Sequence, residues 1–274
     1  MKKILLLILL LIPAQLIAAV IGLEVWDAGS AYPKFIMPKL DNITSTRFHS
    51  RYIQSFNQSN TYQSLHDGNY SRPLGQVYNL ENINNANILA GVVANNPAQM
   101  HIDTPSLNTT LIELKSAGAN PHIIPLGIET MLTSEELKVF HKKIAESVPL
   151  LVLLGGNDVH PSLYGEKITF SIETNLERDK VELSLVKTFI AREKGVLTGF
   201  CRGQQITAVA LGHSLFQDIS SEPTFSSKVK HTYSLSDAND AGTRNILHEI
   251  NIKKDSLIHR ATGKLRITVN SRHH

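Results

Sequence analysis

Short apolar runs alternate with segments of helical periodicity after about residue 86. The runs ILAGVVA (88–94) and PLLVLLGG (149–156) are apolar on both faces, which is typical of strands buried in a parallel sheet. This alternation predicts an α/β fold with a mostly parallel central sheet and helices on both faces. Further strands are expected at 122–126, 196–200, 248–252 and 265–269, and helices at 104–118, 133–146 and 176–193. The second of these helices opens with Thr133 and Glu136 at capping-box spacing, and Leu137, Phe140 and Ile144 form its apolar stripe.

Residues 20–85 differ from the rest of the chain in composition. They are rich in Asn, Ser, Tyr and Gln and show little periodicity, and the stretch NQSNTYQSLHDGNYSRP (57–73) is typical of loops or irregular structure. We therefore expect a polar N-terminal extension or insertion over residues 20–85, and a separate α/β domain over residues 86–274.

The N-terminus has the order of features found in secretory signal peptides. Lys2 and Lys3 precede an apolar run over residues 4–12, Pro13 interrupts it, and small residues lead to Ala19. This order predicts a signal peptide over residues 1–19 and an exported protein, periplasmic or secreted, with no stable membrane span after cleavage. The alternative is an uncleaved membrane anchor, although the apolar stretch is short for a span.

Overall composition excludes several classes of protein. Hydrophobic residues make up 42% of the chain and charged residues 19%, which is enough for a core. The net charge is only +3 and the cations are scattered, so no nucleic-acid-binding surface is indicated. A single cysteine excludes a disulfide framework, and the 12 dispersed histidines lack the spacing of a metal site.

That single cysteine, Cys201, lies where an expected strand becomes an expected helix. Gly199 and Gly203 frame it in a G-x-C-x-G arrangement similar to the nucleophile elbow of hydrolases, which exposes the nucleophile at a tight turn. The helix N-terminus and a nearby Arg202 would increase the thiolate fraction. This pattern predicts a catalytic nucleophile, whereas the alternative is a buried structural cysteine.

A second glycine-rich loop, LLGGNDVHPSLYGE, follows the expected strand 149–156. Ligands bind at the carboxyl ends of strands in open α/β sheets. The backbone N–H groups of Gly156 and Arg202 are therefore candidate donors to the oxyanion formed during acyl transfer. The alternative is an ordinary glycine turn.

Several motifs together resemble the class I glutamine amidotransferase family, and in particular its γ-glutamyl-γ-aminobutyrate hydrolase branch. They are GGNDVHPSLYGE, then Arg178 and Asp179, then GFCRGQQITAVALGHSLFQDI and VNSRHH, and the similarity covers residues 86–274. VIGLEV at residue 20 is an alternative first strand of the family domain, but the spacing after residues 88–94 fits better.

The resemblance implies roles for individual residues. Cys201 corresponds to the nucleophile, and Gly156 and Arg202 to the oxyanion-hole donors. Substrate-binding positions correspond to Gln205, Asn270, Ser271 and His273.

The family's catalytic base lies in a later His-Pro-Glu motif that this sequence lacks. Three explanations remain open: a truncated chain, which we expect; a substitute base such as His273 or His274; or a degenerate relative that binds without cleaving. Loss of the base can cost about as much as loss of the whole catalytic set, so we expect weak activity from this chain by itself.

The sequence therefore predicts hydrolysis of a γ-glutamyl amide through a glutamyl thioester on Cys201, with a small γ-glutamyl compound as substrate and no metal or organic cofactor. An inactive γ-glutamyl-binding module is the alternative. A glutaminase subunit that supplies ammonia to a synthase is a third possibility, which the expected export disfavours.

Overall fold

The computed structural model describes residues 23–27, 34–39, 76–79, 88–94, 104–127, 129, 132–221 and 246–271. These residues fall into two compact units, one within residues 1–168 and 172–215 and the other within 169–171 and 216–274.

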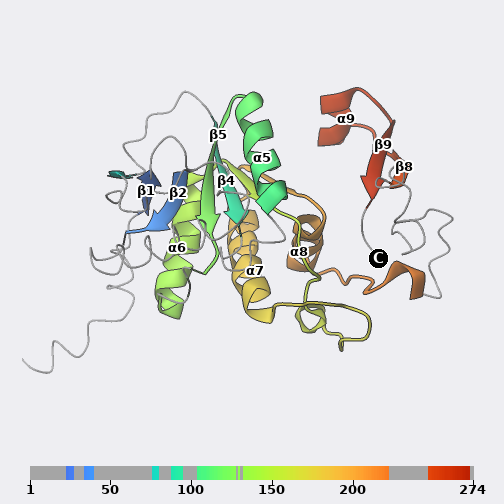
Figure 1. The fold of residues 1–274 in the computed structure, drawn as a ribbon, viewed down its shortest axis with the longest axis horizontal. Helices are drawn as coiled ribbons and strands as arrows, with labels where there is room; N and C mark the ends of the chain where they lie inside the picture. The colour runs from blue at the N-terminus through green and yellow to red at the C-terminus, as the bar shows by residue number, and fades with distance from the viewer. Residues whose placement is uncertain are drawn as a thin grey trace, which may run out of the picture. The chain divides into compact units, whose positions relative to one another are not determined.

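The first unit is built on one seven-stranded sheet with the order β3-β1-β2-β5-β4-β6-β7. Strands β1, β2, β5 and β4 of this sheet are labelled in Figure 1. The five strands from β2 to β7 in this order are parallel, and β1 pairs antiparallel with both β2 and β3. The predicted fold class is confirmed. The strands are β1 (Leu23–Asp27), β2 (Lys34–Pro38), β3 (Gln76–Asn79), β4 (Ile88–Ala94), β5 (Ala119–Pro125), β6 (Leu150–Leu153) and β7 (Val196–Gly199).

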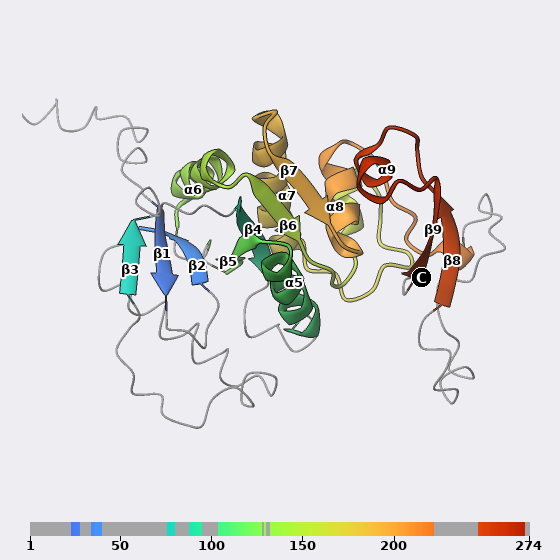
Figure 2. The same cartoon turned by 90° about the horizontal axis from the view of Figure 1, so that it is seen from above.

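Helices connect the parallel strands. The chain steps from β4 to β5 in one direction along the sheet and from β5 to β6 in the other. Because such crossovers are right-handed, α5 lies on one face of the sheet, and α6 and α7 lie on the other (Figure 2). The helices of this unit are α5 (Thr104–Ser116), α6 (Ser134–Ser147), η5 (Pro161–Tyr164), α7 (Leu176–Ala191) and α8 (Arg202–Ala210).

Local sequence explains where α6 begins and what it buries. Thr133 and Glu136 form a capping box: the Glu136 N–H donates to Thr133 Oγ1, and the Thr133 N–H donates to Glu136 Oε2. Phe140 and Ile144 then face the core and are almost fully buried. The capping box and the apolar stripe predicted from the sequence are both confirmed.

The region expected to be an irregular extension contributes three strands, β1, β2 and β3, to the sheet. Phe35, Ile36 and Met37 are buried in the same core as the strands after residue 86. These strands lie among polar residues and lack the helical segments that accompany the strands after residue 86. Strand β1 overlaps VIGLEV (20–25), the alternative first strand, and the loop expected at 57–73 lies outside the described residues.

The second unit contains an antiparallel pair of strands, β8 (Ile246–Asn251) and β9 (Arg266–Ser271), joined through α9 (Leu257–Thr262). Ser256 caps α9 by accepting the His259 N–H, and Gly263, at φ 68°, ends it. Gln217 accepts N–H groups from Thr169, Phe170 and Ser171 through its Oε1. The expected strands near 248–252 and 265–269 are thus present, paired with each other.

The expected signal peptide over residues 1–19 lies outside the described residues. Among the helices that are described, none combines the length and the apolar composition required to cross a bilayer.

Candidate active site

The candidate site is built from the loops that follow β6 and β7. These strands are parallel neighbours, with Leu153 opposite Gly199, so their carboxyl ends meet at the same edge of the sheet. The direction of strand addition reverses between β4 and β6. Such reversals open a crevice at the carboxyl ends of the strands, where ligands bind in open α/β sheets.

Cys201 occupies a sharp turn between β7 and α8. Its φ of 51° and ψ of −114° are unusual for a residue with a side chain, and its side chain is exposed. The Gly203 N–H closes the turn by donating to the Phe200 carbonyl at 2.8 Å, and the Phe200 N–H donates to the Leu153 carbonyl at 3.1 Å. The backbone thus has the strained geometry that presents a side chain at a strand end.

Both glycines of the G-x-C-x-G motif are required by close backbone approach. A Cβ on Gly199 would lie 2.4 Å from the carbonyl carbon of Gly203, and a Cβ on Gly203 would lie 2.5 Å from the carbonyl oxygen of Leu153. Real Cβ atoms do not approach backbone atoms so closely, so neither position accepts a side chain without movement. Helix α8 can therefore start directly against the ends of β6 and β7.

The glycine loop after β6 lies beside the cysteine. A Cβ on Gly155 would be 3.5 Å from Cys201 Cβ, and Gly156 has a φ of 149°. Within the part of the chain that the structure describes, neither the Gly156 N–H nor the Arg202 N–H donates to a protein acceptor. Two N–H groups on loops that meet at the nucleophile are the elements that an oxyanion hole needs.

The Arg202 side chain is buried and carries a second structural role. Its guanidinium donates to Asp179 Oδ1 and to Glu182 Oε2, and all three side chains are at most 1% exposed. Burial by itself lowers the pKa of Arg202, but attraction to Glu182 and Asp179 and their hydrogen bonds outweigh it, so the pKa is raised. Because two carboxylates offset this charge, Arg202 is not the free cation that we expected beside the thiol.

Two residues of α7 extend this network. Arg178 Nε lies 3.7 Å from Glu182 Oε2, and its Nη1 would lie 2.9 Å from a Cβ on Gly156. Arg178 and Asp179 were predicted only as part of a motif, and Glu182 was not predicted as a site residue. A signal was present, because Glu182 lies next to Leu183 on the buried side of an otherwise amphipathic helix.

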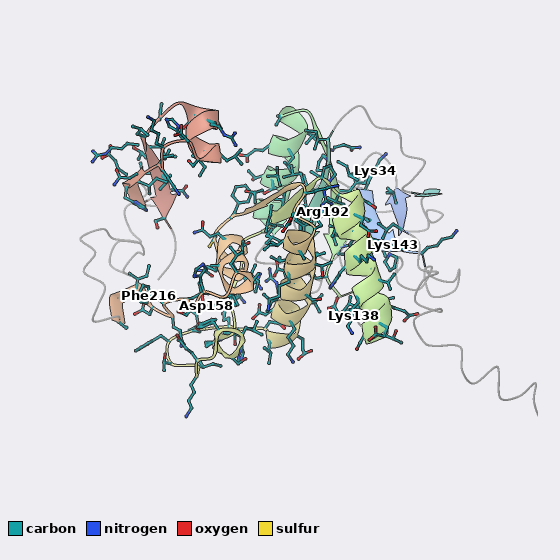
Figure 3. All side chains as sticks on the ribbon, turned by 180° about the vertical axis from the view of Figure 1, so that it is seen from behind. Lys34, Lys138, Lys143, Asp158, Arg192 and Phe216 are labelled. Atoms are coloured by element: carbon teal, nitrogen blue, oxygen red, sulfur yellow. The ribbon has the colours of Figure 1, made fainter. Side chains whose placement is uncertain are left out.

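One hydrogen bond anchors the glycine loop to the start of α7, and two others lie within the segment between β6 and α7. The His160 N–H donates to Asp179 Oδ2 at 2.8 Å, and His160 Nδ1 accepts the Ser162 N–H as the cap of η5. Asp158, labelled in Figure 3, accepts the Ile172 N–H at 2.8 Å.

The remaining predicted site residues lie in different parts of the chain. Gln205 is half-buried in the first turn of α8, close in sequence to the elbow. Asn270 and Ser271 end β9 in the second unit, where Asn270 is exposed and Ser271 is buried. His273 and His274 lie outside the described residues, and the substrate-binding roles stay predictions.

Among the residues that the structure describes, no group of three or more His, Cys, Asp or Glu side chains is placed to hold a metal ion.

Comparison with known proteins places this site in a family. The sequence profile described as Peptidase C26 matches residues 89–274. The protein NtpR of Enterococcus hirae is 34% identical over 130 residues, which are 47% of this chain and 51% of NtpR. The glutamine amidotransferase-like protein YvdE of Lactococcus lactis is 41% identical over 88 residues, covering 32% of this chain and 36% of YvdE. The matched segments thus span at most about half the length of these curated relatives. Since the profile covers more than half of the chain and its motifs form the elbow and the glycine loop, the chain belongs to the Peptidase C26 family, whose domain is of the class I glutamine amidotransferase type.

Proposed function

We propose that this protein hydrolyses the amide bond of a γ-glutamyl compound, with Cys201 as the nucleophile. The observation that carries the proposal is the geometry of Cys201: an exposed thiol at positive φ, at the end of a parallel strand, between two glycines that leave no room for a side chain. Membership of the Peptidase C26 family supports amide bonds as the class of substrate.

In the proposed mechanism, the Cys201 thiolate attacks the γ-carbonyl carbon of the substrate. The N–H groups of Gly156 and Arg202 stabilise the negative charge that develops on the carbonyl oxygen. The C–N bond then breaks, the amine takes a proton from solvent water and leaves, and the glutamyl group remains on sulfur as a thioester. Water subsequently hydrolyses the thioester, which releases glutamate and regenerates the thiol.

The γ-glutamyl part of the proposal rests on the resemblance to the γ-glutamyl-γ-aminobutyrate hydrolase branch. In that assignment Gln205, Asn270, Ser271 and His273 bind the substrate. The name of YvdE, a glutamine amidotransferase-like protein, agrees with an acyl group of the glutamyl type. The proposed partner is a small γ-glutamyl compound rather than a nucleic acid.

Protonation of the leaving amine is the step of the proposed reaction that needs a further group. A plain amide needs a group that protonates the departing nitrogen. In an activated ester such as a p-nitrophenyl ester, p-nitrophenolate leaves as a stable anion and needs no proton. We therefore propose that acylation of Cys201 by a γ-glutamyl ester depends less on a proton donor than acylation by γ-glutamyl-γ-aminobutyrate does.

Mass spectrometry of the intact protein tests this proposal. We expect a γ-glutamyl adduct on Cys201 with γ-glutamyl p-nitrophenyl ester, slower reaction with the amide, and no adduct in Cys201→Ala. Loss of amide turnover in His273→Ala or His274→Ala, with acylation by the ester retained, would identify that histidine as the proton donor, and the absence of any adduct with the ester would contradict the proposed nucleophile. Tight binding of γ-glutamyl compounds without any adduct would instead favour a binding module.

We also propose that residues 1–19 direct export and that the mature protein is periplasmic or secreted. The support is the order of the basic residues, the apolar run and the small residues before Val20.

A further inference from the structure

One carboxylate holds both loops of the candidate active site. Asp179, in the first turn of α7, accepts a hydrogen bond from the Arg202 guanidinium through Oδ1 and from the His160 N–H through Oδ2. Arg202 follows the nucleophile directly, and His160 ends the loop that contains Gly156. We propose that Asp179 is a positioning residue that fixes the Gly156 and Arg202 N–H groups relative to each other, an inference that rests on the function proposed above.

The burial of this ion-pair network restricts the movement of Arg202 relative to α7. Asp179, Glu182 and Arg202 are at most 1% exposed, and the Arg178 side chain is 11% exposed. Two guanidinium groups and two carboxylates balance in charge, so each ion has a counter-ion inside the protein. Moving Arg202 away from α7 would leave buried charges uncompensated, which is strongly unfavourable. Arg202, and with it the turn at Cys201, is thereby held against α7.

Glu182 provides an internal comparison because, like Asp179, it accepts a hydrogen bond from Arg202, whereas only Asp179 also accepts the His160 N–H. Its Oε2 accepts a hydrogen bond from Arg202 and lies 3.7 Å from Arg178 Nε. Within the described residues, its other oxygen, Oε1, has no hydrogen-bond partner. Glu182 therefore reaches the glycine loop only indirectly, through Arg178, whereas Asp179 accepts a hydrogen bond from each of the two loops.

Two reactions of the Cys201 thiol distinguish a misplaced oxyanion hole from a general change in the exposure or reactivity of the thiol. Acylation by an ester passes through a tetrahedral oxyanion: the C–S bond forms, then the C–O bond breaks, and p-nitrophenolate leaves with the electron pair. Alkylation by iodoacetamide displaces iodide in one step and forms no oxyanion. The ratio of the acylation rate to the alkylation rate therefore reports on the oxyanion hole and is insensitive to changes in thiol exposure.

The first experiment compares Asp179→Asn with Glu182→Gln in the full chain. Both changes are isosteric and remove one carboxylate from Arg202, but only Asp179→Asn also weakens the bond to the His160 N–H. Misplacement of a catalytic group by about 1 Å can cost about a hundredfold in rate. We expect the acylation-to-alkylation ratio to fall about tenfold or more in Asp179→Asn and to fall clearly less in Glu182→Gln. Equal ratios in the two variants would overturn the proposal.

A second pair of variants leaves the buried charges untouched, in case Asp179→Asn does not fold. His160 has φ −62° and ψ 123°, which proline adopts readily. His160→Pro removes both the ring and the N–H that Asp179 accepts, whereas His160→Ala removes only the ring. We expect a lower ratio in His160→Pro than in His160→Ala, and equal ratios would contradict a role for this hydrogen bond.

Comparing two esters distinguishes this inference from the proposed function. Positioning of the oxyanion hole affects any acyl group, so the ratio should fall with p-nitrophenyl acetate as well as with the γ-glutamyl ester. If the wild-type protein reacts no faster with the γ-glutamyl ester than with the acetate, the γ-glutamyl proposal fails while the positioning of the oxyanion hole by Asp179 stands. If the wild-type ratio already equals that of a small-molecule thiol with both esters, no oxyanion hole operates and the inference about Asp179 fails too.

Discussion

Gly203 approaches Leu153 so closely that a Cβ on Gly203 would lie 2.5 Å from the Leu153 carbonyl oxygen. The first turn of α8 therefore rests directly on the end of the neighbouring strand β6. Because the contact is with backbone rather than with a flexible side chain, the protein has no easy way to relieve an added methyl group.

We expect Gly203→Ala to lower the free energy of unfolding by about 2–3 kcal/mol or more, as overpacking does in cores. Gly155→Ala is the matched control, because its methyl group would make only an ordinary contact, 3.5 Å from Cys201 Cβ. This control should change stability by less than about 1 kcal/mol while slowing acylation of Cys201. Urea unfolding measures the first effect, and equal stability of the two variants would contradict the steric argument.

The buried ion-pair network gives a second prediction about stability. Arg202→Met would leave Asp179 and Glu182 as buried carboxylates without their main counter-ion, so we expect a loss of about 3–5 kcal/mol. Lys138, on α6 (Figure 3), forms an exposed ion pair with Glu135 at 2.8 Å. Lys138→Met should cost less than about 1 kcal/mol, because solvent screens the exposed pair. Similar losses in the two variants, measured by denaturant titration, would show that burial does not govern the effect.

The parts of the fold that the sequence predicted are those whose causes are local. Residues 88–94 were predicted as a strand and form β4 with the same bounds, because a continuous apolar run suits a strand that is buried on both faces. The capping box at Thr133 and the turn at Cys201 also depend on residues only a few positions apart. Such features are visible in a single sequence.

Long-range pairing was not predictable in the same way. The segment that overlaps β1 was named only as an alternative strand, and β2 and β3 lie among polar residues without accompanying helical segments. The sheet that accepts these three strands is formed by distant residues. Arg202 looked like a free cation near the thiol because its partners, Asp179 and Glu182, lie on another helix. The role of a charged residue depends on which charges it meets after folding, and one sequence does not reveal that pairing.

His141 should make stability depend on pH in the mildly acidic range. It is buried, its Nδ1 lies 3.1 Å from Ser184 Oγ, and burial lowers its pKa from 6.5 to about 4. Between these values the unfolded chain binds a proton that the folded protein does not. Stability is therefore fully present above about pH 6.5 and falls as the pH decreases toward 4, by up to about 3 kcal/mol.

The variant His141→Gln tests this dependence, because glutamine can bond to Ser184 and does not titrate. The stability difference between the wild type and the variant should shrink or reverse as the pH falls from 7 to 4.5. A difference that stays constant over this range, measured by urea unfolding, would rule out His141 as the source of the pH dependence.

Export predicts a defined mature N-terminus. If residues 1–19 are removed by signal peptidase, intact-mass measurement of the protein recovered outside the cytoplasm should show a chain that begins near Val20. A substitution of Lys2 and Lys3 by Glu should reduce export by inverting the charge of the n-region. Recovery of the full-length chain in the membrane fraction would favour the anchor instead.

The strand order also bears on the path by which the protein folds. Strand β2 pairs with β5, with Lys34 opposite His122, although β3, β4 and α5 lie between them in the chain. Strands β6 and β7, in contrast, pair across the shorter segment that contains η5 and α7. Pairing across a longer loop costs more entropy and slows folding, so we expect β4 to β7 to assemble first and the N-terminal strands to dock late. The Cys201 thiol would then already be exposed on a partly folded chain, before strands β1 to β3 have joined the sheet.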